Sequence, residues 1–192
     1  MFTGCATEAN NLAIRGVAAA LRDRGRHIIT SAIEHPSVAA PFGLLGQQGW
    51  DVTVLPVDES GMVNPASVAA ALRPDTVLVS VMHANNEVGT IQPISAISAI
   101  TRPKGIVLHT DAAQSVGKIP VMVDQLGVDL LTIAGHKFYA TKGVGAVYFV
   151  RWLVSDKEGS VQESPLDILK RRYARGEIGR DTFERMKKDL EP

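Results

Sequence analysis

The sequence predicts an α/β protein in which helices cover both faces of a largely parallel β-sheet. Short apolar segments of strand length alternate with helical segments over residues 1–150, and polar clusters follow several of these segments directly. Strands joined through helices favour right-handed crossovers, and therefore parallel pairing. Ligands of such sheets gather at the carboxyl ends of the strands, so one edge is expected to carry a site.

The first half of the alternation contains two helices and two strands. The pattern predicts helix 8–24, stopped by Gly25, then strand 27–30, helix 37–48 and strand 51–55, which Pro56 ends. The second half repeats it. Asn64 and Pro65 supply a cap and a first-turn proline for helix 66–73, followed by strand 77–82, a helix from Pro93 to Thr101 and strands 105–109, 130–134 and 145–150.

The composition argues against a nucleic-acid-binding protein, a membrane-spanning protein and a cysteine-based metal protein. With 20 Lys+Arg against 20 Asp+Glu, the chain has no net field that would favour nucleic acid or an anionic membrane surface. Its apolar runs, such as 76–82, are far shorter than the roughly 20 residues that span a bilayer. The single cysteine, Cys5, provides neither a disulfide framework nor a cysteine-based metal site. We expect a cytoplasmic protein without a metal.

The character of the chain changes after residue 151. Residues 155–163 are polar, and the stretch that follows predicts helix 165–174, a break at Gly176 and helix 181–190. We therefore predict three parts: an α/β domain at 1–151, a linker at 152–163 and a helical hairpin at 164–192. A hairpin of this size is too small to be stable without a partner surface.

Polar residues at predicted strand ends and helix starts suit a phosphate-bearing aromatic cofactor. The helix start at Ala6 and Thr7 favours an anion, Asp111 suits a pyridinium nitrogen, and Lys137 suits imine formation in a partly desolvated pocket. His35 suits stacking on a flat ring. Each residue also has an ordinary interpretation, as a helix cap, a turn-capping carboxylate, a surface lysine or a structural histidine.

Five motifs in order resemble those of the cysteine desulfurases and selenocysteine lyases of the class V aminotransferase group. They are TGCATEANN at 3–11, Glu34-His35, MHANNEVGT at 82–90, HTDAAQSVGK at 109–118 and GHKFY at 135–139. The resemblance covers residues 1–151. It implies the large-domain core of the pyridoxal 5'-phosphate (PLP)-dependent transferase fold, a homodimer, and a role in sulfur metabolism and iron–sulfur cluster assembly.

The resemblance also implies a role for each site residue. Lys137 is the aldimine lysine, Asp111 the partner of the pyridine nitrogen, and His35 the stacking residue that shuttles protons. Asn86 and Gln114 lie near the ring oxygen, and Ala6, Thr7 and His136 hold the phosphate. The family reaction converts L-cysteine, or selenocysteine in the lyases, to alanine, and in the desulfurases leaves a persulfide on a separate cysteine.

Two departures from the family pattern carry expectations. Cys5 stands where the family has glycine, so a positive φ at that position would strain the phosphate loop. The family's N-terminal segment, its substrate-carboxylate arginine and its sulfur-accepting cysteine have no counterpart in this sequence. We therefore expect a truncated core that does not complete persulfide chemistry alone, and the alternative is a non-catalytic PLP-binding remnant or interaction module.

The C-terminal residues 164–192 resemble the short C-terminal domain called SHOCT. The resemblance implies a role in oligomerisation, so tail-mediated assembly is a prediction for this part of the chain. An amphipathic hairpin that docks on its own subunit explains the same pattern.

Overall fold

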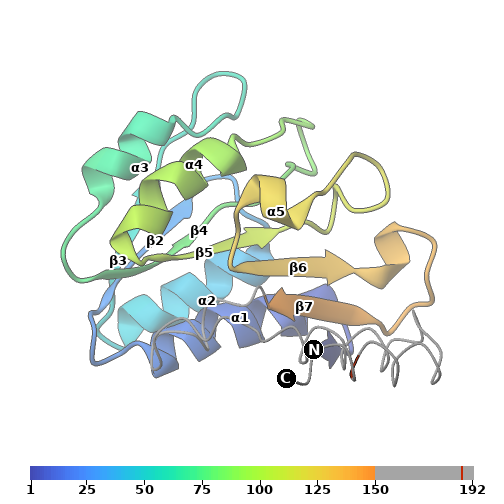
Figure 1. Ribbon diagram of the computed structural model, residues 1–192, viewed down its shortest axis with the longest axis horizontal. Helices are drawn as coiled ribbons and strands as arrows, with labels where there is room; N and C mark the ends of the chain where they lie inside the picture. The colour runs from blue at the N-terminus through green and yellow to red at the C-terminus, as the bar shows by residue number, and fades with distance from the viewer. Residues whose placement is uncertain (150–186, 188–192) are drawn as a thin grey trace. The chain divides into compact units, whose positions relative to one another are not determined.

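A seven-stranded sheet in the order β1-β7-β6-β5-β4-β2-β3 forms the centre of the structure (Figure 1). The computed structural model describes residues 1–149 and residue 187, and the predicted linker and hairpin otherwise lie outside the described residues. The strands are β1 (Phe2–Thr3), β2 (His27–Ser31), β3 (Asp51–Leu55), β4 (Thr76–Ser80), β5 (Val107–Asp111), β6 (Leu130–Ala134) and β7 (Gly145–Phe149). The five strands from β6 to β3 are parallel, whereas β7 and β1 add antiparallel pairs at one edge. The predicted, largely parallel α/β sheet is confirmed.

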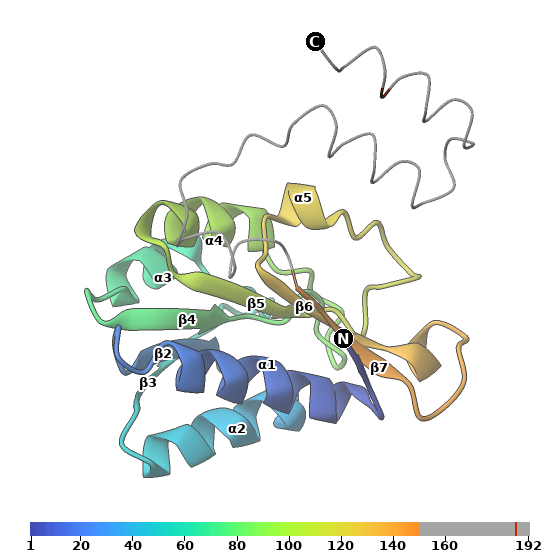
Figure 2. The ribbon, with the colours of Figure 1, turned by 60° about the horizontal axis from the view of Figure 1, so that its bottom comes forward.

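Helices cover both faces of this sheet (Figures 1 and 2). On one face lie α1 (Ala6–Ala20) and α2 (Pro36–Gln47), and on the other α3 (Pro65–Ala71), α4 (Ile94–Thr101) and α5 (Val123–Leu126). The start of α3 is the predicted one, because Asn64 accepts a hydrogen bond from the backbone N–H of Ala66 at 2.9 Å. No helix among the described residues is long and apolar enough to cross a membrane.

Several boundaries differ from the sequence predictions, and two short elements were not predicted. Helix α1 ends at Ala20 rather than Arg24, and a turn follows it. Strand β5 starts two residues later than predicted, because a 3₁₀ turn over Arg102–Lys104 is closed by Gly105 in the left-handed conformation (φ 63°). Strand β1 and helix α5, with two and four residues, are too short to produce a periodic signal.

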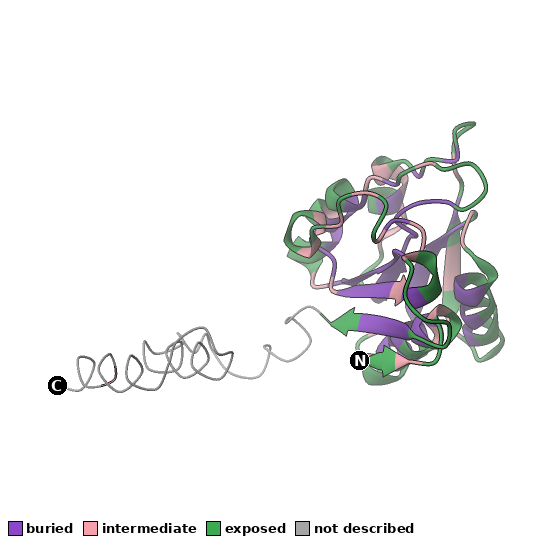
Figure 3. Cartoon of the chain, turned by 90° about the vertical axis from the view of Figure 1, so that its right-hand side faces the viewer, coloured by how far each residue is buried: buried purple, intermediate pink, exposed green. Residues whose placement is uncertain are grey.

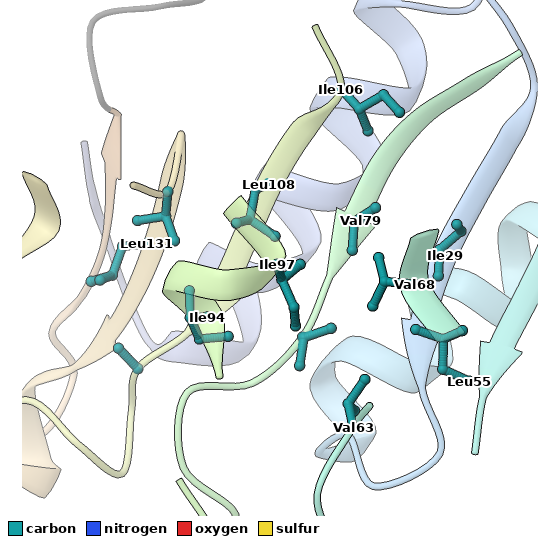
Figure 4. Close-up of a cluster of buried hydrophobic side chains, with 13 residues drawn as sticks. Ile29, Leu55, Val63, Val68, Val79, Ile94, Ile97, Ile106, Leu108 and Leu131 are labelled. Atoms are coloured by element: carbon teal, nitrogen blue, oxygen red, sulfur yellow. The ribbon is translucent and has the colours of Figure 1, made fainter. Parts of the chain in front are cut away.

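Strand register builds the core between the sheet and α3 and α4. Ile29 of β2 pairs with Val79 of β4, and Val79 pairs with Leu108 of β5, so the three side chains form one apolar row. Ile94 and Ile97 of α4 pack against this row, as Figure 4 shows. Figure 3 shows that the interior of the sheet is buried while the outer helix surfaces are exposed. A packed sheet of this kind is a rigid support for side chains at its strand ends.

A pair of glycines tests this packing. An added Cβ at Gly25 would lie 2.1 Å from the backbone oxygen of Asp75, whereas one at Gly16, in the middle of α1, would meet nothing within 4 Å. We expect Gly25→Ala to lower the free energy of unfolding by about 1–3 kcal/mol. Gly16→Ala should raise it by roughly 0.5–1 kcal/mol, because alanine favours helix. Urea unfolding of both variants checks this, and shifts of the same sign would contradict the packing.

Candidate active site

A pocket of about 350 Å³ opens at the carboxyl-end edge of the sheet, beside the first residues of α1 and α2. Its size falls within the roughly 300–1,000 Å³ typical of small-molecule sites. The residues that line it come from five separate parts of the sequence. They are Cys5, Ala6, Thr7, His35, Ser37, Met82, Ala84, Asn86, Asp111, Ala113, Gln114, Ala134, His136 and Lys137.

All eight residues predicted from the sequence line this one pocket. Ala6 and Thr7 come from the start of α1, His35 from the start of α2, Asn86 from the loop after β4, Asp111 and Gln114 from the end of β5 and its following turn, and His136 and Lys137 from the turn after β6. Their individual roles toward a cofactor remain predictions. Their convergence follows from parallel pairing, which brings the ends of β4, β5 and β6 to the same edge.

Asp111 is the buried acid of the pocket, with 4% of its surface exposed. One carboxylate oxygen, Oδ1, accepts a hydrogen bond from the backbone N–H of Ala113 at 2.9 Å, and Oδ2 accepts one from Asn10 Nδ2 at 2.7 Å. Burial raises the pKa of Asp111, and these two donors and the nearby His35 oppose that rise. A cationic group placed against this carboxylate would favour its charged form.

The loop that presents His35 is tied to the sheet by Glu34. Glu34 Oε1 accepts hydrogen bonds from Ser31 Oγ at 2.5 Å and from the backbone N–H of Met82 at 2.8 Å, so the loop is anchored to the ends of β2 and β4. The second oxygen, Oε2, is buried and has no hydrogen-bond partner among the described residues. Burial raises the pKa of Glu34 to about 8, against the opposing effect of the two donors.

The start of α1 provides free backbone donors. Its N-cap residue, Cys5, makes no side-chain capping bond, so the first amides of a 15-residue helix are not capped from within. The strain that a positive φ would have imposed at Cys5 is absent, because its backbone is extended (φ −167°, ψ 168°), a conformation open to any residue. Gly145 of β7 packs so closely that an added Cβ would lie 2.4 Å from the Cys5 carbonyl carbon. This contact fixes the loop that precedes the helix.

The remaining residues lie at the exposed part of the pocket. Lys137 and His136 belong to a 3₁₀ turn over Gly135–Lys137, and both are exposed. The sequence argument assumed a partly desolvated lysine; the structure does not show this, because none of the described residues cover the turn enough to bury Lys137. Asn86 is also exposed, and Gln114, which is partly buried, accepts a hydrogen bond from Lys118 Nζ at 3.2 Å.

The sequence analysis missed several residues of the site. Asn10 lies behind the pocket and bonds to its acid, and Ser37 lines the pocket and bonds to the imidazole. Asn10 and Glu34 were noted only as parts of motifs. Asn10 has a weak signal in the sequence, since it follows Ala6 by one helical turn and therefore lies on the same face of α1. Ser37 was missed although it lies two residues after His35, because its bond to Asn10 joins segments 27 residues apart.

A second depression, of about 290 Å³, includes Arg24, Arg73 and Lys104 and lies where β4 begins. Arg73 is already engaged there, since it forms ion pairs with Asp51 at 2.8 Å and Asp75 at 2.9 Å. None of the predicted site residues line this depression, so the chemistry is assigned to the pocket that contains Asp111 and Lys137.

Comparison with protein-family models identifies both parts of the sequence. Residues 1–158 match the model for aminotransferase class-V, and residues 164–191 match the model for the short C-terminal domain, SHOCT. The chain belongs to the aminotransferase class-V family. Pyridoxal phosphate is the cofactor of this family, whose class V and cysteine desulfurase members depend on it.

The chain is similar to curated proteins that are cysteine desulfurases. It is 56% identical over 148 residues to cysteine desulfurase IscS of Dictyoglomus turgidum, a match that covers 77% of this chain and 38% of that protein. It is 48% identical over 164 residues to cysteine desulfurase IscS of Methanosarcina thermophila, covering 84% and 41%. The chain thus spans about two fifths of the length of these relatives.

Solved structures agree with the fold. SspA in complex with cysteine superposes with a TM-score of 0.74 at 44% identity, covering 77% of this chain and 43% of that one. DndA from Streptomyces lividans gives a TM-score of 0.75 at 45% identity, covering 82% and 44%. The predicted fold class and family resemblance are therefore confirmed.

The raised pKa of Glu34 predicts a specific pH dependence of stability. Its unfolded-state pKa is near 4.5 and its folded-state pKa is about 8, so between these values the folded chain holds a proton that the unfolded chain lacks. The free energy of unfolding should fall as pH rises through this window, by up to about 1.4 kcal/mol per unit from this group. Glu34→Gln should flatten the dependence and stabilise the chain at pH 8.

Urea unfolding between pH 5 and pH 8.5 measures this effect. Glu59→Gln is the matched control, because Glu59 is exposed and lies in the loop after β3, away from the pocket. The interpretation fails if the parent and Glu34→Gln show parallel pH profiles.

Proposed function

We propose that the pocket binds PLP through Lys137 and supports desulfurase-type chemistry on L-cysteine, giving L-alanine and passing the sulfur to a thiol acceptor as a persulfide. The observation that carries the proposal is the convergence of Ala6, His35, Asp111 and Lys137, with four further predicted residues, on one pocket. The chain's membership of a family rich in cysteine desulfurases supports the choice of substrate. The same family membership weighs against the alternative, a non-catalytic remnant or interaction module.

The residues present fit the cofactor. The uncapped amides at Ala6 and Thr7, together with His136, form a donor set suited to a phosphate. Asp111 offers a buried carboxylate, which a protonated ring nitrogen would pair with and keep ionised. Asn86 and Gln114 offer amide groups to the ring oxygen.

When bound, PLP supplies an electron sink conjugated to the amino group of the substrate. Lys137 would hold the cofactor through its Nζ and would give up this position to the amino group of the substrate. Asp111 would pair with the ring nitrogen and favour its protonated form by stabilising the positive charge. His35, next to Glu34 in an anchored loop, receives and returns protons at its ring nitrogen, the function for which imidazole is suited near neutral pH.

Lys137→Ala tests cofactor attachment. After incubation with PLP and removal of excess, the parent should show a visible absorption band that borohydride reduces and fixes to the protein, and Lys137→Ala should lack it. Lys142→Ala is the matched control, since Lys142 is an exposed lysine five residues further on that does not line the pocket. If the parent is folded but shows no borohydride-reducible absorption band, the proposal is wrong.

Alanine release separates catalysis from binding. With L-cysteine and an added dithiol, the parent loaded with PLP should release alanine, and Lys137→Ala should reduce the rate by a factor of about 10³ or more. Chromatographic detection of alanine, beside sulfide released by the dithiol, measures both products. A parent that binds PLP but yields no alanine above free PLP would leave only cofactor binding and refute the desulfurase part.

A further inference from the structure

A chain of hydrogen bonds, buried at Asp111, Asn10 and Ser37 and reaching the exposed His35, joins the acid of the pocket to its imidazole. Asn10 Nδ2 donates to Asp111 Oδ2 at 2.7 Å and to Ser37 Oγ at 2.9 Å, and Ser37 Oγ lies 2.7 Å from His35 Nδ1. Asn10 belongs to α1, Ser37 to α2 and Asp111 to β5. Two helices and the central strand are thus connected through one linkage behind the pocket.

The direction of each bond follows from the donors available. The amide nitrogen of Asn10 only donates, so Ser37 Oγ accepts from it and has its own hydrogen free for His35 Nδ1. The backbone N–H of Ser37 also donates to Nδ1, at 3.1 Å. Since Nδ1 accepts in both contacts, neutral His35 carries its proton on Nε2.

The burial of this linkage indicates a purpose beyond packing. Asn10 is 0% exposed and Ser37 6%. Both amide hydrogens of Asn10 are used, yet its Oδ1 is buried and has no hydrogen-bond partner among the described residues. An unpartnered buried oxygen is costly, and an apolar side chain would fill the same space without that cost. Turning the amide around would place Oδ1 against the carboxylate of Asp111, so the observed orientation is the favourable one.

We propose that Asn10 and Ser37 are positioning residues that couple the orientation of Asp111 to that of His35. Asn10 orients the carboxylate, and Ser37 fixes the imidazole with its proton on Nε2. This inference rests on the proposed function, in which Asp111 and His35 contact the cofactor and substrate. A change at Asn10 therefore alters His35, which it does not touch, as well as Asp111, which it does.

The first test uses the chain without cofactor, so it does not depend on PLP binding. Long-range proton–nitrogen NMR correlations of ¹⁵N-histidine-labelled chain report which ring nitrogen of His35 is protonated, and His35→Gln assigns the signals. The parent should show a proton on Nε2 and a hydrogen-bonded Nδ1. Ser37→Ala and Asn10→Ala should both move the Nδ1 signal.

The matched control is Asn11→Ala, because Asn11 is the next residue of α1 and its side chain donates to the Thr7 carbonyl at 3.0 Å, outside the linkage. It should leave the His35 signals at their parent positions. An unchanged Nδ1 signal in Asn10→Ala would overturn the proposal. Thermal unfolding shows whether each variant folds, and if Asn10→Ala does not, Asp111→Asn replaces it, since its effect on His35 is expected to pass through Asn10.

The second test measures the dissociation constant for PLP. Asn10→Ala should weaken binding by about tenfold or more, because it removes a donor to a buried carboxylate. Ser37→Thr, which keeps the hydroxyl, should stay within about threefold of the parent, while Ser37→Ala weakens binding further. The double variant Asn10→Ala/Ser37→Ala should lose less than the product of the single losses, because both act through one linkage.

Losses that simply multiply would show that the two residues act independently and would overturn the coupling. The NMR test and the PLP-binding test also distinguish a failure of this inference from a failure of the proposed function. If the parent takes up no PLP, the proposed function fails, whereas the NMR measurement still decides whether Asn10 sets His35.

Discussion

The carboxylate of Asp111, buried at the end of the central strand β5, is the constraint around which the site is arranged. A carboxylate removed from water loses much of its hydration, and the protein must replace it with directed donors. Ala113 provides one from the turn that follows the strand, and Asn10 provides another from α1. For Asn10 to reach β5, α1 must lie close against the sheet, which the buried alanines Ala9 and Ala13 on the same helix face allow.

The order of helices and strands was readable from the sequence because it depends on local signals. The bounds of β3 and β6 agree with the prediction, since turns flank both segments and both contain β-branched residues. The error at β5 has a different origin. The predicted strand ended at His109, whereas β5 continues through Thr110 to Asp111, and the ring of His109 lies 2.8 Å from Ser80 and 3.0 Å from Thr132 on the neighbouring strands. Only the register of the sheet reveals such partners.

In the candidate site, too, local sequence signals identified some residues, while contacts between distant segments determine others. Family motifs identified the residues that face the pocket, and the structure brings all eight together. The residues that hold them in place, Asn10, Ser37 and Glu34, depend on contacts between segments up to 101 residues apart, which no spacing rule encodes. The exposure of Lys137 was likewise beyond sequence reasoning, because it depends on what surrounds the turn after β6 and not on the turn itself.

The two buried acids of the site differ in what surrounds them, and this difference sets their charge. Glu34 and Asp111 are close enough for the charge of Asp111 to raise the pKa of Glu34, which burial already raises to about 8. Near neutral pH Glu34 is therefore mainly protonated, which also removes the cost of leaving its buried Oε2 ionised without a donor. Among the described residues that line the pocket, Asp111 is the one carboxylic acid, and a cationic group placed against it would favour its charged form. Two ionised carboxylates would repel one another and loosen the loop that carries His35, so the neutrality of Glu34 keeps both the charge and the geometry of the site defined.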